Sequence, residues 1–148
     1  MEFKNDLAFL SNFYPSPIEL GSKEYPTVEH AFQSMKTKDP ELKELIRNAS
    51  TPGKAKRLGS NVRLREDWEE KKHLVMYQAV HKKFTSTTEL RDKLLKTGDQ
   101  KLVEGNSWHD NYWGNCGCKK CIGIHGENHL GEILMDIRKA LKEEFSQK

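Results

Sequence analysis

Helix-start signals divide this sequence into short segments. Asp39-Pro40 and Thr51-Pro52 each place a capping side chain before a proline, and proline is favoured in the first turn of a helix. Thr27 and Thr87 are two further N-cap candidates. Because the free amides at a helix start need an acceptor, this pattern predicts a chain made mainly of short helices. We expect them from Val28 to about Thr37, from Glu41 to Asn48, from Thr51-Pro52 to near Gly59, and from Thr87 to Gly98.

Apolar periodicity predicts two longer helices, one from Leu64 to about Thr85 and one from about Asn128 to Phe145. A turn at Gly21-Ser22 favours a small hairpin between Ile18–Leu20 and Lys23–Tyr25. The predicted fold class is therefore α+β, dominated by helices and with a few short strands. The first long helix carries one apolar stripe of Leu64, Trp68, Val75 and Ala79 and an adjacent stripe of Met76, Val80 and Phe84.

Length and composition favour one soluble domain. The 148 residues match about one domain of ordinary size, so we expect a single domain over residues 1–148. Three Trp, four Tyr and six Phe are too many aromatics for a disordered chain. No apolar run approaches the ~20 residues that span a bilayer, and residues 1–6 do not form a signal peptide, so we expect a cytoplasmic protein with no membrane partner. A net charge of +3 is too small to predict wrapping of nucleic acid.

Polar residues share one face of the helix that follows Thr27. Glu29, Gln33 and Lys36 fall at positions i, i+4 and i+7, so a carboxylate, an amide and an amine point the same way. A solvated helix surface is the commoner meaning of such a pattern, and a functional site is the alternative.

A long aromatic loop separates the last two predicted helices. Residues 105–126 lack periodicity, and loops of this length inside a domain are usually functional. Trp108, Asp110, Tyr112 and Trp113 suit a pocket that stacks a heterocycle and holds an acidic group near its sugar. The alternative is that Trp108 and Trp113 only anchor the loop in the core.

A basic helix start is predicted after Thr51. Lys54, Lys56 and Arg57 could bind a phosphate there, because free amides and the helix dipole both favour an anion. A solvated basic helix is the alternative.

The three cysteines lie close together in the sequence. Cys116, Cys118 and Cys121, with His125 four residues on, have the ligand types of a tetrahedral zinc site. Most structural zinc sites draw two ligand pairs from separated segments, so we favour reduced free thiols and expect no metal and no cofactor. An odd number of cysteines in one short segment argues against a disulfide framework.

Seven segments in this order resemble the YbiA-like family, also called the NADAR domain family: residues 9–13, 25–33, 54–59, 65–68, 101–104, 110–114 and 128–135. The resemblance implies the YbiA-like fold and an N-glycosidase. Its substrates would be riboflavin-pathway ribosylamino-pyrimidine phosphates, or ADP-ribose attached to guanine. A non-catalytic module that binds ADP-ribose or a nucleotide is the alternative. The oligomeric state is not predicted.

The resemblance also implies roles for single residues. Glu29 and Asp110 would be the catalytic carboxylates, one orienting water or shielding the cationic sugar and the other holding ribose hydroxyls or acting as second acid or base. Their assignment can be reversed, and Lys36 could instead form a Schiff base with the sugar. Asn115 stands where many relatives have Asp. The expected substrate-binding residues are Asn12, Phe13, Gln33, Lys36, Lys54, Lys56, Arg57, Trp68, Tyr112, Trp113 and Asn115.

Overall fold

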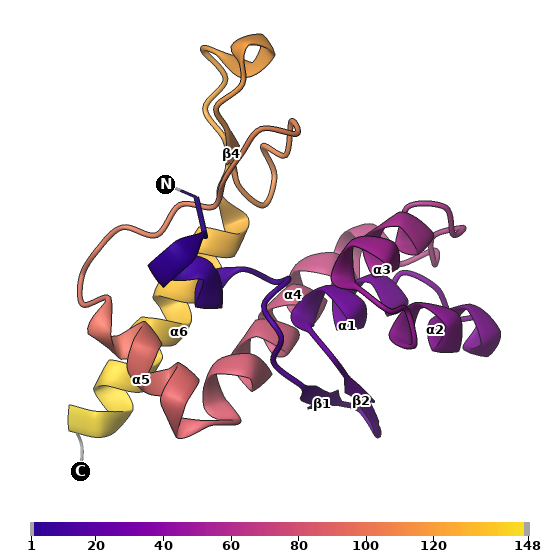
Figure 1. Cartoon of the computed structure of the whole chain (residues 1–148), viewed down its shortest axis with the longest axis horizontal. Coiled ribbons are helices and arrows are strands. Elements are labelled where there is room, and N and C mark those ends of the chain that lie inside the picture. Colours follow the sequence, from indigo (N-terminus) through magenta and orange to yellow (C-terminus); the bar gives the residue numbers. More distant parts are fainter. Residues whose placement is uncertain (1, 147–148) are drawn as a thin grey trace. The chain divides into compact units, whose positions relative to one another are not determined.

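The computed structural model describes residues 2–146 and confirms the helix-dominated α+β fold class (Figure 1). The chain groups into two units. One unit is Asn12–Thr87, and the other combines the described residues up to Ser11 with those from Thr88 onward. Among residues 2–146, no helix is both long enough and apolar enough to cross a bilayer.

The unit Asn12–Thr87 contains a hairpin and four helices. The predicted hairpin is confirmed: β1 (Ile18–Leu20) pairs antiparallel with β2 (Lys23–Tyr25), and Gly21 takes the left-handed backbone angle that the tight turn requires. The helices are α1 (Val28–Ser34), α2 (Pro40–Arg47), α3 (Pro52–Gly59) and α4 (Trp68–Thr85). The three expected N-caps of α1, α2 and α3 are confirmed, because the side chains of Thr27, Asp39 and Thr51 each accept backbone hydrogen bonds.

Helix α1 lies at the centre of this unit, packed against α2, α3 and α4. Every residue of α1 is buried, while β1 packs against α4. The predicted stripe of Met76, Val80 and Phe84 is buried, as expected. The prediction that α4 begins at Leu64 is wrong, because the backbone amide of Arg65 donates to the carbonyl of Lys36 and the helix starts only at Trp68; Leu64 is exposed.

The other unit is built on the α-helices α5 and α6 and a short 3-10 helix. A short 3-10 helix, η1 (Asn5–Leu10), packs against α5 (Thr88–Lys96), and α5 packs against α6 (His129–Ser146). Its core consists of apolar side chains from these three helices and from Leu102.

The aromatic loop carries short elements that the sequence pattern did not predict. Strand β3 (Gly105–Asn106) pairs in parallel with β4 (Asn115–Cys116), and η2 (Lys119–Cys121) follows. The loop is joined to the start of α6, because the amides of His129 and Leu130 donate to carbonyls of Tyr112 and Trp113 (Figure 1).

Candidate functional site

The start of α1 is fixed by its N-cap residue, Thr27, and by the side chain of His30. Thr27 Oγ1 accepts from the backbone amide of His30 at 3.1 Å and lies 2.8 Å from the His30 ring nitrogen Nδ1. The other ring nitrogen, Nε2, lies 2.9 Å from the carbonyl of Ala49. These hydrogen bonds fix the first turn of α1, a helix in which every residue is buried. The side chains that follow Thr27 therefore have fixed positions.

Glu29 and Gln33 form a buried polar pair on α1. Gln33 Nε2 donates to Glu29 Oε1 at 2.8 Å, and the two residues are only 7% and 4% exposed. The interpretation as a solvated helix surface is therefore wrong for these two residues. Gln33 Oε1 is buried and lacks a hydrogen-bond partner within residues 2–146, which is costly unless a ligand or water supplies a donor.

Lys36 lies just beyond the end of α1 and belongs to the same electrostatic group. Burial lowers its pKa, the carboxylate of Glu29 raises it, and Lys56 lowers it. The Lys36 Nζ atom lies 5.8 Å from the centre of the Phe32 ring, and that ring lies 5.1 Å from the Trp68 ring. The structure thus brings groups from α1, α3 and α4 to one region of the unit.

The three basic residues of α3 occupy different positions along that helix. Lys54 is exposed near the capped start, where its amide donates to Thr51 Oγ1. Helix α3 has only eight residues, so Lys56 and Arg57 already belong to its last turn and lie away from the free amides at its start. Of the three, Lys56 is the one that influences the pKa of Lys36.

Asn12 and Phe13 precede α1, and Trp68 begins α4. The carbonyl of Asn12 accepts from the amide of Glu29 at 3.1 Å, and Asn12 Nδ2 donates to the sulfur of Met76 at 3.5 Å. Asn12 therefore positions the start of α1. Phe13 is 41% exposed, whereas Trp68 is 4% exposed and packs on Phe32.

Asp110 lies in the other unit and organises the loop around itself. Its Oδ1 atom accepts from the amides of Tyr112 at 3.1 Å and Trp113 at 2.9 Å. The buried Asn106 accepts from the Asp110 amide at 3.1 Å and donates to the Asp110 carbonyl at 2.8 Å. The position of the Asp110 side chain is thus fixed by its own loop.

The loop aromatics differ in burial. Tyr112 and Trp113 pack edge to face with ring centres 4.7 Å apart, and Tyr112 lies 4.4 Å from the His129 ring. Trp113 is half-buried and Trp108 is 53% exposed. The interpretation that both tryptophans only anchor the loop in a core is wrong for Trp108.

Asn115 has a structural partner. Its side-chain Oδ1 atom accepts from the backbone amide of Gly126 at 2.8 Å, and its backbone amide donates to the carbonyl of Glu104. A carboxylate oxygen at this position would accept the same bond.

Sequence reasoning missed Glu104, Lys83 and His109. Glu104 is half-buried, accepts from Asn106 Nδ2 at 3.2 Å and lies so close to Gly114 that a Cβ there would overlap it. Lys83 is 1% exposed, and burial lowers its pKa to about 7. Its place three residues after Val80 on the apolar side of α4 was an available signal.

The histidine that lies with the three cysteines is His109. Its ligand atom and the sulfurs of Cys116, Cys118 and Cys121 all lie within 4.8 Å of one another. His125, which sequence spacing suggested, is exposed and does not belong to this group.

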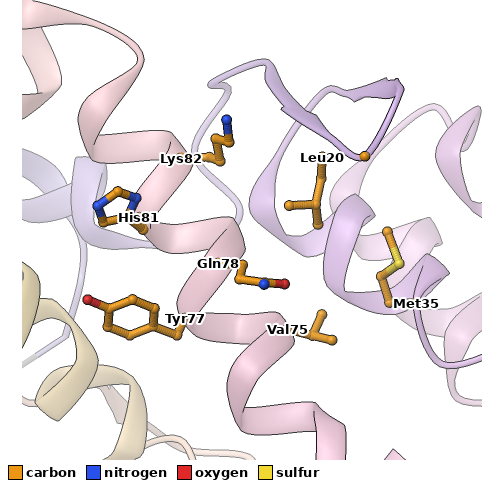
Figure 2. Close-up of a pocket in the computed structure, with 8 residues that line it drawn as sticks. Leu20, Met35, Val75, Tyr77, Gln78, His81 and Lys82 are labelled. Carbon is orange, nitrogen blue, oxygen red and sulfur yellow. The ribbon is translucent and has the colours of Figure 1, made fainter.

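A pocket of about 410 Å³ lies in the unit Asn12–Thr87, where side chains of α4 face the hairpin turn and Met35 (Figure 2). None of the residues predicted to form the site lines it. Its lining residues are Leu20, Gly21, Met35, Val75, Tyr77, Gln78, His81 and Lys82.

Known proteins resemble this chain over nearly its whole length. The NADAR domain family model matches residues 2–142. An N-glycosidase of Nostoc punctiforme is 43% identical over 137 residues, which cover 89% of this chain and 84% of that protein. N-glycosidase YbiA of Escherichia coli is 41% identical over 139 residues, 93% of this chain and 83% of that protein.

The solution structure of E. coli YbiA has the same fold. It matches with a TM-score of 0.86 and 38% identity, covering 100% of this chain and 86% of the YbiA chain. A riboflavin biosynthesis protein of Vibrio vulnificus is 38% identical over 137 residues, which cover 91% of this chain and 36% of that protein. The predicted YbiA-like fold is confirmed.

Proposed function

The chain belongs to the NADAR domain family and is a hydrolase acting on N-glycosyl bonds, and we propose that its substrate joins a nitrogenous base to a phosphorylated ribose. We further propose that this substrate is a ribosylamino-pyrimidine phosphate of the riboflavin pathway. The relative of V. vulnificus named as a riboflavin biosynthesis protein supports that choice over ADP-ribose on guanine.

The observation that carries this proposal is the buried polar group on α1. Breaking an N-glycosidic bond develops positive charge at the ribose anomeric carbon and negative charge on the base. Glu29 is a buried carboxylate held at a fixed angle by Gln33, which suits it to shield that cation or to orient the attacking water. Gln33 Oε1, which accepts no hydrogen bond from the part of the chain that the structure describes, is available to accept from a sugar hydroxyl.

Positive charge near Glu29 supports a phosphorylated sugar. Lys56 lies close enough to Lys36 to lower the pKa of Lys36, so two ammonium groups lie near the Glu29 carboxylate. We propose that Lys36 and Lys56 bind the 5-phosphate. Lys54 and Arg57, exposed on the same helix α3, are the further phosphate contacts we propose.

Asp110 is proposed as the second carboxylate. It would hold the ribose hydroxyls or protonate the departing nitrogen, with Tyr112 and Trp113 flanking the base. Base–aromatic stacking contributes about 1–3 kcal/mol per base, enough to orient a pyrimidine.

The test is a panel of ribosylated substrates, incubated with the full chain and assayed for free base by mass spectrometry. Glu29→Gln is expected to lower kcat by at least ~10²-fold, since general acid–base catalysis contributes about that much. Glu41→Gln, which changes an exposed carboxylate on α2, is the matched control and should retain parental kcat. Binding of these substrates without release of base, or near-parental turnover by Glu29→Gln, would overturn the proposal.

A further inference from the structure

The aromatic loop gathers four soft or borderline ligands at one point. Cys116 lies on β4, Cys118 immediately precedes η2 and Cys121 ends it, and His109 lies earlier in the same loop. The four ligand atoms all lie within 4.8 Å of one another. We propose that His109, Cys116, Cys118 and Cys121 form a structural Cys₃His zinc site.

The distances fit a tetrahedral ion. His109 Nδ1 lies 3.4 Å from the sulfur of Cys121 and 3.3 Å from that of Cys118. Ligands about 2.0–2.3 Å from a tetrahedral zinc are separated from one another by roughly 3.5–3.8 Å. The ring and the sulfurs therefore need only small shifts to bind one ion.

Amide donors hold two of the sulfurs in place. The backbone amides of His109 and Cys118 donate to Cys116 Sγ at 3.3 and 3.4 Å, and the side-chain Asn111 Nδ2 donates to Cys121 Sγ at 3.4 Å. Such donors orient ligands around structural metals as well.

The sequence spacing also fits a closed metal site. Cys118 and Cys121 form a C-x-x-C pair across the turn of η2, the spacing that zinc sites use most. His109 adopts a φ of 70°, a left-handed backbone angle that costs energy for a residue other than glycine. The side chain of this residue lies beside the three sulfurs. Four protein ligands leave no open position, so the ion would be structural and not catalytic.

The proposed ion would stabilise the loop that carries Asp110. Its ligands bridge residues 109 and 121, and Asp110 is the next residue after His109. Zinc would therefore restrain the backbone on both sides of that carboxylate. This consequence rests on the proposed function, whereas the metal site does not.

The test measures metal binding by the full chain, independently of activity. The chain is stripped with a chelator, reloaded with Zn²⁺ or Co²⁺, and analysed for metal content and for the visible spectrum of bound cobalt. We expect about one zinc ion per chain and the intense bands of tetrahedral, thiolate-bound cobalt. His109→Ala should weaken zinc binding by at least about 100-fold, since even outer partners of metal ligands contribute about 10–100-fold.

His125→Ala is the matched control, because it removes the histidine that sequence spacing suggested, and it should bind zinc as tightly as the parent chain. Cys118→Ser is a second ligand variant that preserves side-chain size, and it should also lose zinc. The inference is overturned if the parent chain binds far less than one zinc ion, or if its cobalt spectrum is weak and octahedral. Loss of zinc in His125→Ala with none in His109→Ala would equally overturn it.

Discussion

Gly59 is the position at which packing around the proposed site can be tested most directly. It is the last residue of α3 and faces Gln33 on α1. A Cβ atom at this position would overlap Gln33 Oε1 and lie 2.8 Å from Gln33 Cδ and 2.9 Å from Gln33 Cβ. Gly59→Ala must therefore displace Gln33, and with it the hydrogen bond that holds Glu29.

The size of the effect follows from two opposing contributions. Overpacking a tight interior typically costs about 1–3 kcal/mol. Alanine favours a helix over glycine by up to about 1 kcal/mol, less at a helix end. The expected net loss in unfolding free energy is about 1–2 kcal/mol, which lowers Tm by roughly 2–8 °C for a chain of this size. The kcat should fall as well, because Glu29 loses its fixed orientation.

Gly53→Ala is a control on the same helix. Its Cβ would lie 3.9 Å from Thr51 Oγ1, an ordinary contact, so this variant should be as stable as the parent chain or slightly more stable. Thermal unfolding followed by circular dichroism, with kcat measured on the same samples, compares the two. If Gly59→Ala unfolds at the same temperature as Gly53→Ala and turns over at the parental rate, α3 does not approach Gln33 as described.

Two further substitutions test single residues. Asp110→Ala should lose about 0.5–2 kcal/mol of unfolding free energy, because two backbone amides lose their acceptor. Asp110→Asn keeps an acceptor oxygen, so it should keep the stability of the parent chain but have a lower kcat. A parental kcat in Asp110→Asn would leave Asp110 with a structural role alone. Lys83 has its pKa lowered from 10.5 to about 7 by burial, so the unfolded chain binds its proton more tightly and folding stability rises between about pH 7 and 10.5. Lys83→Met should therefore stabilise the chain by a few kcal/mol below pH 7 and hardly at all above about pH 10, at about 1.4 kcal/mol per pH unit. Urea unfolding at both ends of this range measures the difference, and equal gains at both ends would refute the burial argument.

Local patterns predicted the helices because their signals are local. Thr27, Asp39 and Thr51 each cap the helix that they were expected to start, since a side chain and an amide three residues on need no distant partner. The start of α4 was misplaced because it depends on a distant bond. The backbone amide of Arg65 donates to the carbonyl of Lys36, and nothing in the sequence near Leu64 indicates that hydrogen bond.

The burial of α1 could not be predicted from its residues. A polar stripe normally marks a solvated face, and only the arrangement of α2, α3 and α4 around α1 removes that face from water. The metal cluster shows the same limit. Sequence distance favoured His125 as the fourth ligand, but the pairing of β3 with β4 brings the segment before Asp110 back towards the cysteines.

Three features that are costly for folding lie at residues to which we assign a function. Gln33 keeps a buried acceptor that no group within residues 2–146 satisfies, Lys36 is held near Lys56, and His109 takes a left-handed backbone angle. Buried unsatisfied groups and such angles each cost about 1–3 kcal/mol, so stability alone does not account for them. A ligand that donates to Gln33, a phosphate bound by the two lysines and an ion bound by His109 would each offset one of these costs. Binding of substrate and of zinc should therefore each raise the unfolding temperature of the chain.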